Sequence, residues 1–235
     1  MQHTTVEFLD WDSNFFKKKV GRILFEENID MISNLEFAKK KGYDLVYVFS
    51  RYNLYCSSDI LSKFGGKLID RKVQYAKKIT TTISESNVSE YSSLELSEPL
   101  EQLAYKSGQY SRFRVDNQFQ EDDFSRLYKI WIKKSIEKEI ADKVYVVKEN
   151  DAIYGMATLK IGVNKGEIGL IAVSDLHQGK GYGKALIEAC YNDLLKRDIN
   201  IIEVPTQFAN KNACIFYEKC GFSIKSITNI YHFWL

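Results

Sequence analysis

Residues 173–184 have the sequence VSDLHQGKGYGK, in which three glycines alternate with other residues directly after an apolar run. The apolar run, 166–173, predicts a buried strand, and the amphipathic stretch 181–196 predicts a helix. Glycine lets a ligand approach the backbone closely, and the free N–H groups at a helix start favour a bound diphosphate. The sequence therefore predicts a phosphate-binding loop here, to which Lys180 and Lys184 add positive charge.

The spacing of the glycines excludes two other kinds of phosphate loop. The Walker pattern requires Ser or Thr after its lysine, whereas Lys184 is followed by Ala185. The dinucleotide-binding fingerprint requires G-x-G-x-x-G, whereas Gly179, Gly181 and Gly183 are spaced G-x-G-x-G. Alternating glycines alone also fit a flexible loop, so the assignment depends on the neighbouring segments.

Three segments together resemble the motifs of the GNAT superfamily of N-acetyltransferases. Residues 178–183 (QGKGYG) resemble its Q/R-x-x-G-x-G/A loop, and 169–173 (GLIAV) resemble its splayed fourth strand. Residues 210–222 (NKNACIFYEKCGF) resemble its N-x-x-A-x-x-F-Y-E-K-x-G-F helix. The resemblance covers about 91–235. It implies a GNAT fold of the α/β (α+β) class, with a mixed, mostly antiparallel, splayed central sheet preceded by a smaller α/β domain.

The resemblance implies acetyl-CoA as the acetyl donor and no metal. The glycine loop would hold the diphosphate of CoA, and the pantetheine arm would fill the gap beside the splayed strand. A backbone N–H near Leu170 or Ile171 would then face the thioester oxygen. Asn210 would contact the pantetheine or cap its helix. The cofactor-binding residues implied in this way are Leu170, Ile171, Ala172, Val173, Gln178, Gly179, Lys180, Gly181, Tyr182, Gly183, Lys184, Asn210, Ala213 and Phe216.

Two residues are catalytic candidates. The resemblance implies that Tyr217 protonates the departing CoA thiolate, and a phenol is protonated at neutral pH. Helical spacing alone favours core packing for this tyrosine. Glu167 is a candidate general base for the amine, with a water chain and, less favoured, Asp116 as the alternatives. Cys214 and Cys220 lie near Tyr217 in the sequence without a histidine partner, so direct transfer in a ternary complex is preferred to a cysteine intermediate.

A narrower resemblance concerns the acceptor. Residues 11–16 (WDSNFF), 111–114 (SRFR), 131–132 (WI) and 205–207 (PTQ) are similar to segments of bacterial dTDP-fucosamine acetyltransferases. This similarity implies a dTDP-linked 4-amino-4,6-dideoxy sugar of surface polysaccharide synthesis as the substrate. Arg112 or Arg114 would bind the diphosphate. Trp11 and Phe15 would stack on the thymine or sugar, or pack at a domain interface.

Two alternative functions stay open. One is a GNAT enzyme that acts on another amine, such as a peptide N-terminus, a polyamine or an antibiotic. The other is a non-catalytic module that binds acyl-CoA.

Composition limits the class of protein. The chain has 235 residues, of which 45% are hydrophobic and 27% charged, as in a globular protein with a core. A net charge of +2 argues against a nucleic-acid partner. No apolar run approaches the ~18 residues of a membrane span. Four cysteines in no metal-binding pattern indicate reduced thiols and a cytoplasmic location. A small-molecule amine is the expected partner, and a homodimer is possible.

The polar segment 80–90 is the expected linker between an N-terminal α/β domain, 1–80, and the GNAT domain, 91–235. A strand pair is expected to end near residue 78, and two strands over 222–235. A shift of 156 residues aligns 42–48 with 198–204, and chance similarity remains an alternative explanation. A real repeat would make the first domain a degenerate, catalytically silent copy of the C-terminal half-sheet. It lacks the glycine loop and has Leu61 opposite Tyr217.

Overall fold

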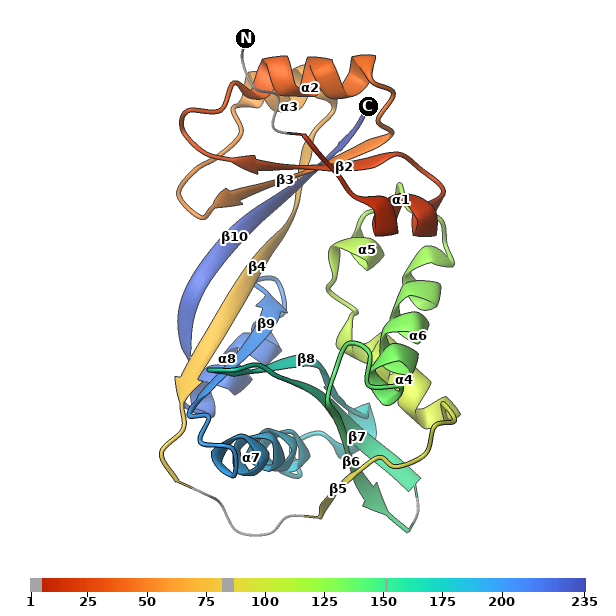
Figure 1. The fold of residues 1–235 in the computed structure, drawn as a ribbon, viewed down its shortest axis with the longest axis vertical. Coiled ribbons are helices and arrows are strands. Elements are labelled where there is room, and N and C mark those ends of the chain that lie inside the picture. Colours follow the sequence, from red (N-terminus) through yellow and green to blue (C-terminus); the bar gives the residue numbers. More distant parts are fainter. Residues whose placement is uncertain (1–5, 82–86, 151) are drawn as a thin grey trace. The chain divides into compact units, whose positions relative to one another are not determined.

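The computed structural model describes residues 6–81, 87–150 and 152–235 (Figure 1). It divides into two units. The first comprises Met1–Val73, Gln207–Ala209 and Ser226–Leu235, and the second comprises Gln74–Thr206 and Asn210–Lys225. The boundary at Val73 falls inside a strand rather than in the polar segment 80–90, of which residues 82–86 lie outside the described residues. The end of the chain also belongs to the first unit.

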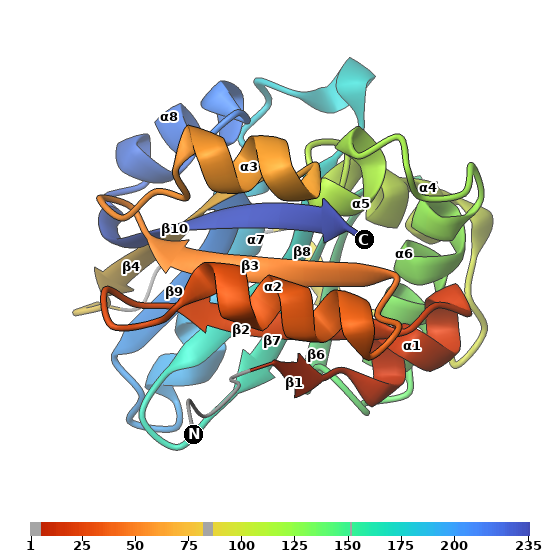
Figure 2. The same ribbon diagram turned by 90° about the horizontal axis from the view of Figure 1, so that it is seen from above.

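The first unit is a small sheet with helices on one face. Figure 2 shows α2 and α3 on the same face of β2, β3 and β10. Strands β2 and β3 pair in parallel over six successive positions, and β10 pairs antiparallel with β3. Its elements are β1 (Glu7–Phe8), α1 (Asp10–Phe16), β2 (Val20–Phe25), α2 (Met31–Lys40), β3 (Leu45–Arg51), α3 (Ser58–Phe64), and parts of β4 (Lys67–Lys78) and β10 (Ser223–Trp234).

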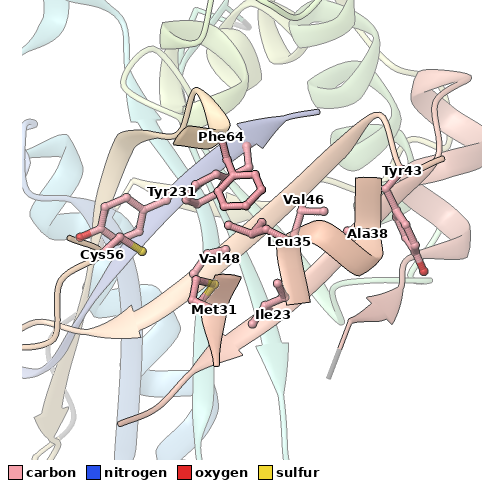
Figure 3. Close-up of a cluster of buried hydrophobic side chains, with 11 residues drawn as sticks. Ile23, Met31, Leu35, Ala38, Tyr43, Val46, Val48, Cys56, Phe64 and Tyr231 are labelled. Carbon is pink, nitrogen blue, oxygen red and sulfur yellow. The ribbon is translucent and has the colours of Figure 1, made fainter. Parts of the chain in front are cut away.

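The core of this unit joins segments from the two ends of the chain (Figure 3). Leu35 of α2 and Val46 of β3 are completely buried, and so is Phe233 of β10. Burying one such side chain contributes roughly 1.5–3 kcal/mol. A Cβ added to Gly66 would lie 2.2 Å from Cε1 of Phe233, so only glycine allows this ring to pack here. The C-terminal strand is therefore part of the core of the first unit.

The second unit contains a mostly antiparallel sheet with helices on both faces. Strands β5 to β8 form an antiparallel meander, and β9 pairs in parallel with β8. Helix α4 packs against β7 and β8, while α7 packs against β6, β7 and β8 from the other side (Figure 1). Its elements are β5 (Val88–Glu90), α4 (Glu98–Ser107), α5 (Arg112–Val115), α6 (Asp123–Ile136), β6 (Lys143–Glu149), β7 (Ala152–Ile161), β8 (Gly166–Val173), the 3-10 helix η1 (Asp175–His177), α7 (Tyr182–Leu195), β9 (Ile201–Gln207) and α8 (Lys211–Lys219).

All ten strands form one hydrogen-bonded series in the order β1-β2-β3-β10-β4-β9-β8-β7-β6-β5. The expected mixed, mostly antiparallel sheet is therefore confirmed. Three local expectations are wrong. The expected strand pair ending near residue 78 is the single twelve-residue strand β4, and the two strands expected over 222–235 are the twelve-residue strand β10. Val88–Glu90, expected in the linker, is edge strand β5.

The offset of 156 residues recurs in the bounds of the elements. Strand β3 begins at Leu45 and β9 at Ile201, while β4 begins at Lys67 and β10 at Ser223. Both pairs of strands also end at residues that differ by the same number. The order strand, helix, strand is thus repeated in the chain, with strands of matching length.

Strands β8 and β9 separate soon after they meet. Among the described residues, their parallel pairing comprises Gly166 with Ile202 and Glu167 with Glu203. Beyond this point β8 is bulged, because Gly169 and Leu170 together stand opposite Thr158 of β7. The bulge turns β8 away from its earlier course. The splayed strand expected from the sequence is therefore confirmed.

A buried carboxylate lies at the closed end of this separation. The Glu203 side chain is 4% exposed and accepts hydrogen bonds from Lys165 Nζ at 2.7 Å and Lys225 Nζ at 2.5 Å. Burial alone would raise the pKa of Glu203, but the hydrogen bonds from the two lysines outweigh it and lower that pKa. The ion pairs join β9 to β10 and to the turn before β8.

We predict that Glu203→Gln lowers the free energy of unfolding by about 1–2 kcal/mol at pH 7, because two charge-assisted hydrogen bonds weaken. A lowered folded-state pKa means that the carboxylate stabilises above its unfolded pKa and loses this effect as the pH falls through the folded pKa. Urea denaturation from pH 7 down to pH 3 should show the two proteins converging in acid. A constant difference would contradict the assignment, and Glu139→Gln, on the surface, is the control.

A second prediction concerns Asn229, which is fully buried in β10. Its Nδ2 lies 3.0 Å from the carbonyl oxygen of Arg51 and 3.2 Å from those of Tyr52 and Leu54. Asn229→Ala should cost about 2–3 kcal/mol of unfolding free energy, because it leaves buried carbonyls without this donor. Denaturant titration should show no comparable loss for Asn53→Ala, at an exposed position of the same loop; equal effects would refute the role of Asn229.

Candidate active site

A cleft of about 640 Å³ lies in the second unit, where β8 ends and α7 and α8 begin. It combines the separated strand, the glycine loop and one face of α8. The structure thus brings together most of the residues expected to bind the cofactor. Those that line the cleft are Ile171, Ala172, Val173, Gln178, Gly179, Gly181, Tyr182, Gly183, Lys184, Asn210, Ala213 and Phe216, together with the catalytic candidate Tyr217.

The three glycines of the loop are required for two different reasons. Gly179 and Gly181 have φ angles of 78° and 85°, in the left-handed region that disfavours residues with a Cβ. Gly183 is needed for packing, because a Cβ there would lie 3.0 Å from Cζ of Phe216. Gly181 is the N-cap of α7, so the first N–H groups of that helix lack partners within it. Such a helix start is an anion-binding site.

An aromatic stack adjoins the glycine loop. The His177 ring lies 3.7 Å from the Tyr154 ring and is stacked on it, and the Tyr182 ring lies 6.3 Å away. The Nδ1 atom of His177 lies 2.8 Å from Oγ of Ser174. This histidine also lines the cleft, and it is not among the site residues expected from the sequence. Its position two residues before the first glycine of the loop could have indicated that His177 lies at the site.

Tyr217 lies in the wall of the cleft and is 3% exposed. Its ring packs against Tyr75 at 5.6 Å and Phe222 at 5.8 Å. Burial, followed by the nearby Cys220 and Cys214 thiols, raises the pKa of Tyr217 well above its ordinary value. The phenol is therefore neutral across the physiological range, and it can donate a proton.

Helix α8 is anchored by strand β4. The Tyr75 hydroxyl donates to Oε1 of Glu218 at 2.9 Å, and Lys77 Nζ donates to the Cys220 carbonyl oxygen at 2.7 Å. At the other end, Oδ1 of Asn210 accepts from the N–H of Ala213 at 3.1 Å, which is the helix-capping alternative for that residue. Both ends of the short helix that carries Tyr217 are thereby fixed.

Three of the expected cofactor-binding and catalytic residues are absent from the described lining of the cleft. The N–H of Leu170 donates to Oγ1 of Thr158 at 2.9 Å, so it does not face a ligand as expected. The bulge is the reason, because it turns the Leu170 amide toward β7 and leaves Ile171 as the lining residue. Lys180 is exposed, and Glu167 pairs in register with Glu203 at the closed end of the strands.

The acceptor candidates fall in three places. Arg114 lines a second cleft of about 580 Å³, where its guanidinium lies 5.4 Å from the Phe124 ring. Arg112 instead packs 4.5 Å from the Phe113 ring and is outside the described lining of both clefts. Trp11 and Phe15 belong to α1 of the first unit, where their rings stack on each other at 5.1 Å.

The C-terminal end of α4 contributes to the site, although no residue there is expected from the sequence. Lys106, Ser107, Gln109 and Tyr110 line the first cleft, and Lys106 and Gln109 line the second cleft as well. These residues are more than sixty positions away from the glycine loop in the sequence. Only the packing of α4 against β7 and β8 brings them to the site, so no local signal could have identified them.

Within the ranges that the structure describes, no three His, Cys, Asp or Glu side chains form a group able to hold a metal ion. No helix in those ranges has the length and apolar character needed to cross a membrane. All four cysteines are free thiols, and Cys56, Cys190 and Cys214 are buried.

A model of the acetyltransferase (GNAT) family matches residues 106–222. Streptothricin acetyltransferase of Escherichia coli is 42% identical over 57 residues, which are 24% of this chain and 33% of that protein. The chain therefore spans about a third of the length of this curated relative.

Solved structures share the fold. A GCN5-related N-acetyltransferase from Sphaerobacter thermophilus has a TM-score of 0.59 at 12% identity, over 97% of this chain and 75% of that one. A functionally unknown conserved protein from Staphylococcus epidermidis has a TM-score of 0.68 at 10% identity, over 99% and 91% of the chains. A tandem GNAT protein of the clavulanic acid biosynthesis pathway has a TM-score of 0.53 at 11% identity, over 91% and 74%.

The family match contains the separated strand β8, the glycine loop and Tyr217, the same features that form the cleft. Residues 106–222, just under half of this chain, are therefore similar to the acetyltransferase (GNAT) family.

Proposed function

We propose that this protein is an N-acetyltransferase that transfers the acetyl group of acetyl-CoA directly to a primary amine. The observation that carries the proposal is the convergence of a diphosphate cradle, a separated strand edge and a neutral phenol in one cleft. The match of residues 106–222 to the acetyltransferase (GNAT) family model supports the same chemistry.

The cleft suits the parts of acetyl-CoA in order. The unpartnered N–H groups at the start of α7 and the cation of Lys184 favour the diphosphate. The exposed edge of β8 at Ile171–Val173 lines the cleft, where it can hydrogen-bond the amide groups of the pantetheine arm. With the Leu170 amide already occupied, we assign the donor for the thioester oxygen to Ile171.

The transfer needs one proton delivered and one removed. The neutral amine nitrogen attacks the thioester carbon and gives up one proton to water, the carbon–sulfur bond breaks, and the CoA thiolate takes the phenolic proton of Tyr217. The Tyr217 phenolate then regains a proton from water. An acceptor amine bound as ammonium must first lose a proton. Because Glu167 is outside the described lining, a water chain is the better route for that proton.

For the acceptor we propose a nucleotide-linked 4-amino-4,6-dideoxy sugar used in surface polysaccharide synthesis. The support is the second cleft, which shares Lys106, Gln109 and Asp175 with the first. The guanidinium of Arg114, in the lining of the second cleft, suits a diphosphate, and the Phe124 ring offers a surface for a base.

A second candidate acceptor is an antibiotic amine. The 57-residue similarity to streptothricin acetyltransferase favours it, because the identity of that segment reaches 42%. Both candidates use the same donor cleft, and they differ only in what the second cleft recognises.

We infer that the first unit is a degenerate, catalytically silent copy of the C-terminal half-sheet. Its parallel strands β2 and β3 pair over six successive positions, from Val20–Leu45 to Phe25–Ser50, so they leave no gap like that between β8 and β9. Leu61 occupies the position offset by 156 residues from Tyr217. The chain should therefore bind one CoA. The four free thiols support a cytoplasmic location.

We predict that Tyr217→Phe lowers kcat about 10²–10⁴-fold, the usual contribution of a general acid, with the CoA dissociation constant changed less than about twofold. Steady-state rates and calorimetry measure the two effects. Burial raises the Tyr217 pKa, so the wild-type rate should not fall as the pH rises from 8 to 9. Tyr191→Phe is the matched control, since Tyr191 is a buried tyrosine outside the described lining. An unchanged rate in Tyr217→Phe would remove its acid role.

The acceptor proposal predicts turnover of dTDP-4-amino-4,6-dideoxyhexoses in preference to polyamines and streptothricin-type amines. Arg114→Met should raise KM for the nucleotide sugar about 10-fold or more, because a charge-assisted contact is lost, and leave the KM for small amines unchanged. Arg197→Met, outside both described linings, serves as the control. Turnover of other amines but not of these sugars would discard the sugar and keep the acetyltransferase.

A further inference from the structure

An ion pair joins α4 to the loop before the glycines. Lys106 lies in the last turn of α4, and its Nζ donates to Oδ1 of Asp175 in η1. The Lys106 side chain is 19% exposed and that of Asp175 80% exposed. Both residues line both clefts, so this pair stands where the two clefts adjoin.

The same carboxylate oxygen also contacts the diphosphate cradle. Oδ1 of Asp175 accepts from Nε2 of Gln178 at 3.2 Å, and Gln178 is the residue directly before Gly179. Because Lys106 and Gln178 share this oxygen, the ammonium group of Lys106 is adjacent to the start of the glycine loop. It therefore lies within reach of an anion bound at that loop.

Asp175 is in an unusual place for a carboxylate. Among the residues that the structure describes, it is the one acid in the lining of either cleft. A negative charge beside a diphosphate site repels the ligand. The other cation lining the first cleft, Lys184, has its own partner, Glu188, at 3.5 Å on α7. Asp175 is thus the group that holds Lys106 in place at the edge of the cradle.

We propose that Lys106 is a ligand of the donor's diphosphate. Before the diphosphate binds, Asp175 positions the Lys106 ammonium at the edge of the site. The inference rests on the proposed function, since the diphosphate is that of acetyl-CoA. A partly exposed ion pair contributes little stability, so breaking it is easy. A hydrogen bond between the ammonium and a doubly charged diphosphate is stronger. When the diphosphate binds, Lys106 therefore exchanges the carboxylate oxygen of Asp175 for an oxygen of the diphosphate.

The exchange makes the two residues interdependent. In the wild type, Asp175 weakens CoA binding in two ways, because it repels the diphosphate and competes for Lys106. Without Lys106, only the repulsion remains. Neutralising Asp175 should therefore have a larger effect on CoA affinity when Lys106 is present than when it is absent.

The experiment is a calorimetric titration of CoA into the full chain and three variants: Lys106→Met, Asp175→Asn and the double variant. We expect Lys106→Met to weaken CoA binding about 10-fold, as for one charge-assisted hydrogen bond. Asp175→Asn should tighten it about 5-fold in the wild type and about 2-fold beside Lys106→Met. High salt should reduce every difference.

Two controls isolate the diphosphate. Pantetheine, which lacks it, should bind all four proteins equally. Lys129→Met, at an exposed lysine of α6 outside both described linings, should leave CoA affinity unchanged. Equal CoA affinity in the wild type and Lys106→Met overturns this inference alone. If Asp175→Asn changes CoA affinity equally in the wild type and in Lys106→Met, the proposed exchange of partners by Lys106 is overturned. No CoA binding by the wild type overturns the proposed function and the inference together.

Discussion

The early end of hydrogen bonding between β8 and β9 is the constraint on which the site depends. After Gly166 and Glu167, the two parallel strands share no further described pairs, and the bulge at Gly169–Leu170 redirects β8. An unpaired strand edge inside a protein needs other hydrogen-bond partners. Here the bulge satisfies one amide through Thr158, while the residues beyond it line a cleft that a ligand can fill. Glu203 and its two lysines hold the strands together at the closed end.

The rest of the site is arranged around this gap by the two helices that border it. Helix α7 contributes a start shaped by glycines with left-handed backbone, and α8 contributes a buried tyrosine. The Cβ-free position of Gly183 lets Phe216 of α8 pack against the start of α7. Strand β4 fixes the far end of α8 through Tyr75 and Lys77. The cradle and the proton donor are therefore parts of one packed arrangement.

What could be predicted from the sequence follows from the range of the interactions involved. The glycine loop and the helix carrying Tyr217 depend on residues close together in the chain, so their sequence motifs were sufficient to predict these two elements. The length of β4 and β10 was not predictable in this way, because a strand continues for as long as neighbours pair with it. The same holds for β5, whose three residues are ordered by pairing with β6. The orientation of the Leu170 amide depends on a bulge against β7, and the role of α4 depends on tertiary packing. The expected linker and the observed unit boundary differ for the same reason, since β4 takes part in both units.

Hydrogen exchange measured with and without acetyl-CoA tests the central claim most directly. If the gap beside β8 is the donor site, amides of residues 171–173 and 179–184 should exchange more slowly in the complex, while those of β2 and β3 should be unaffected. Unchanged exchange at 171–173 with saturating acetyl-CoA, or protection confined to the first unit, would contradict the account.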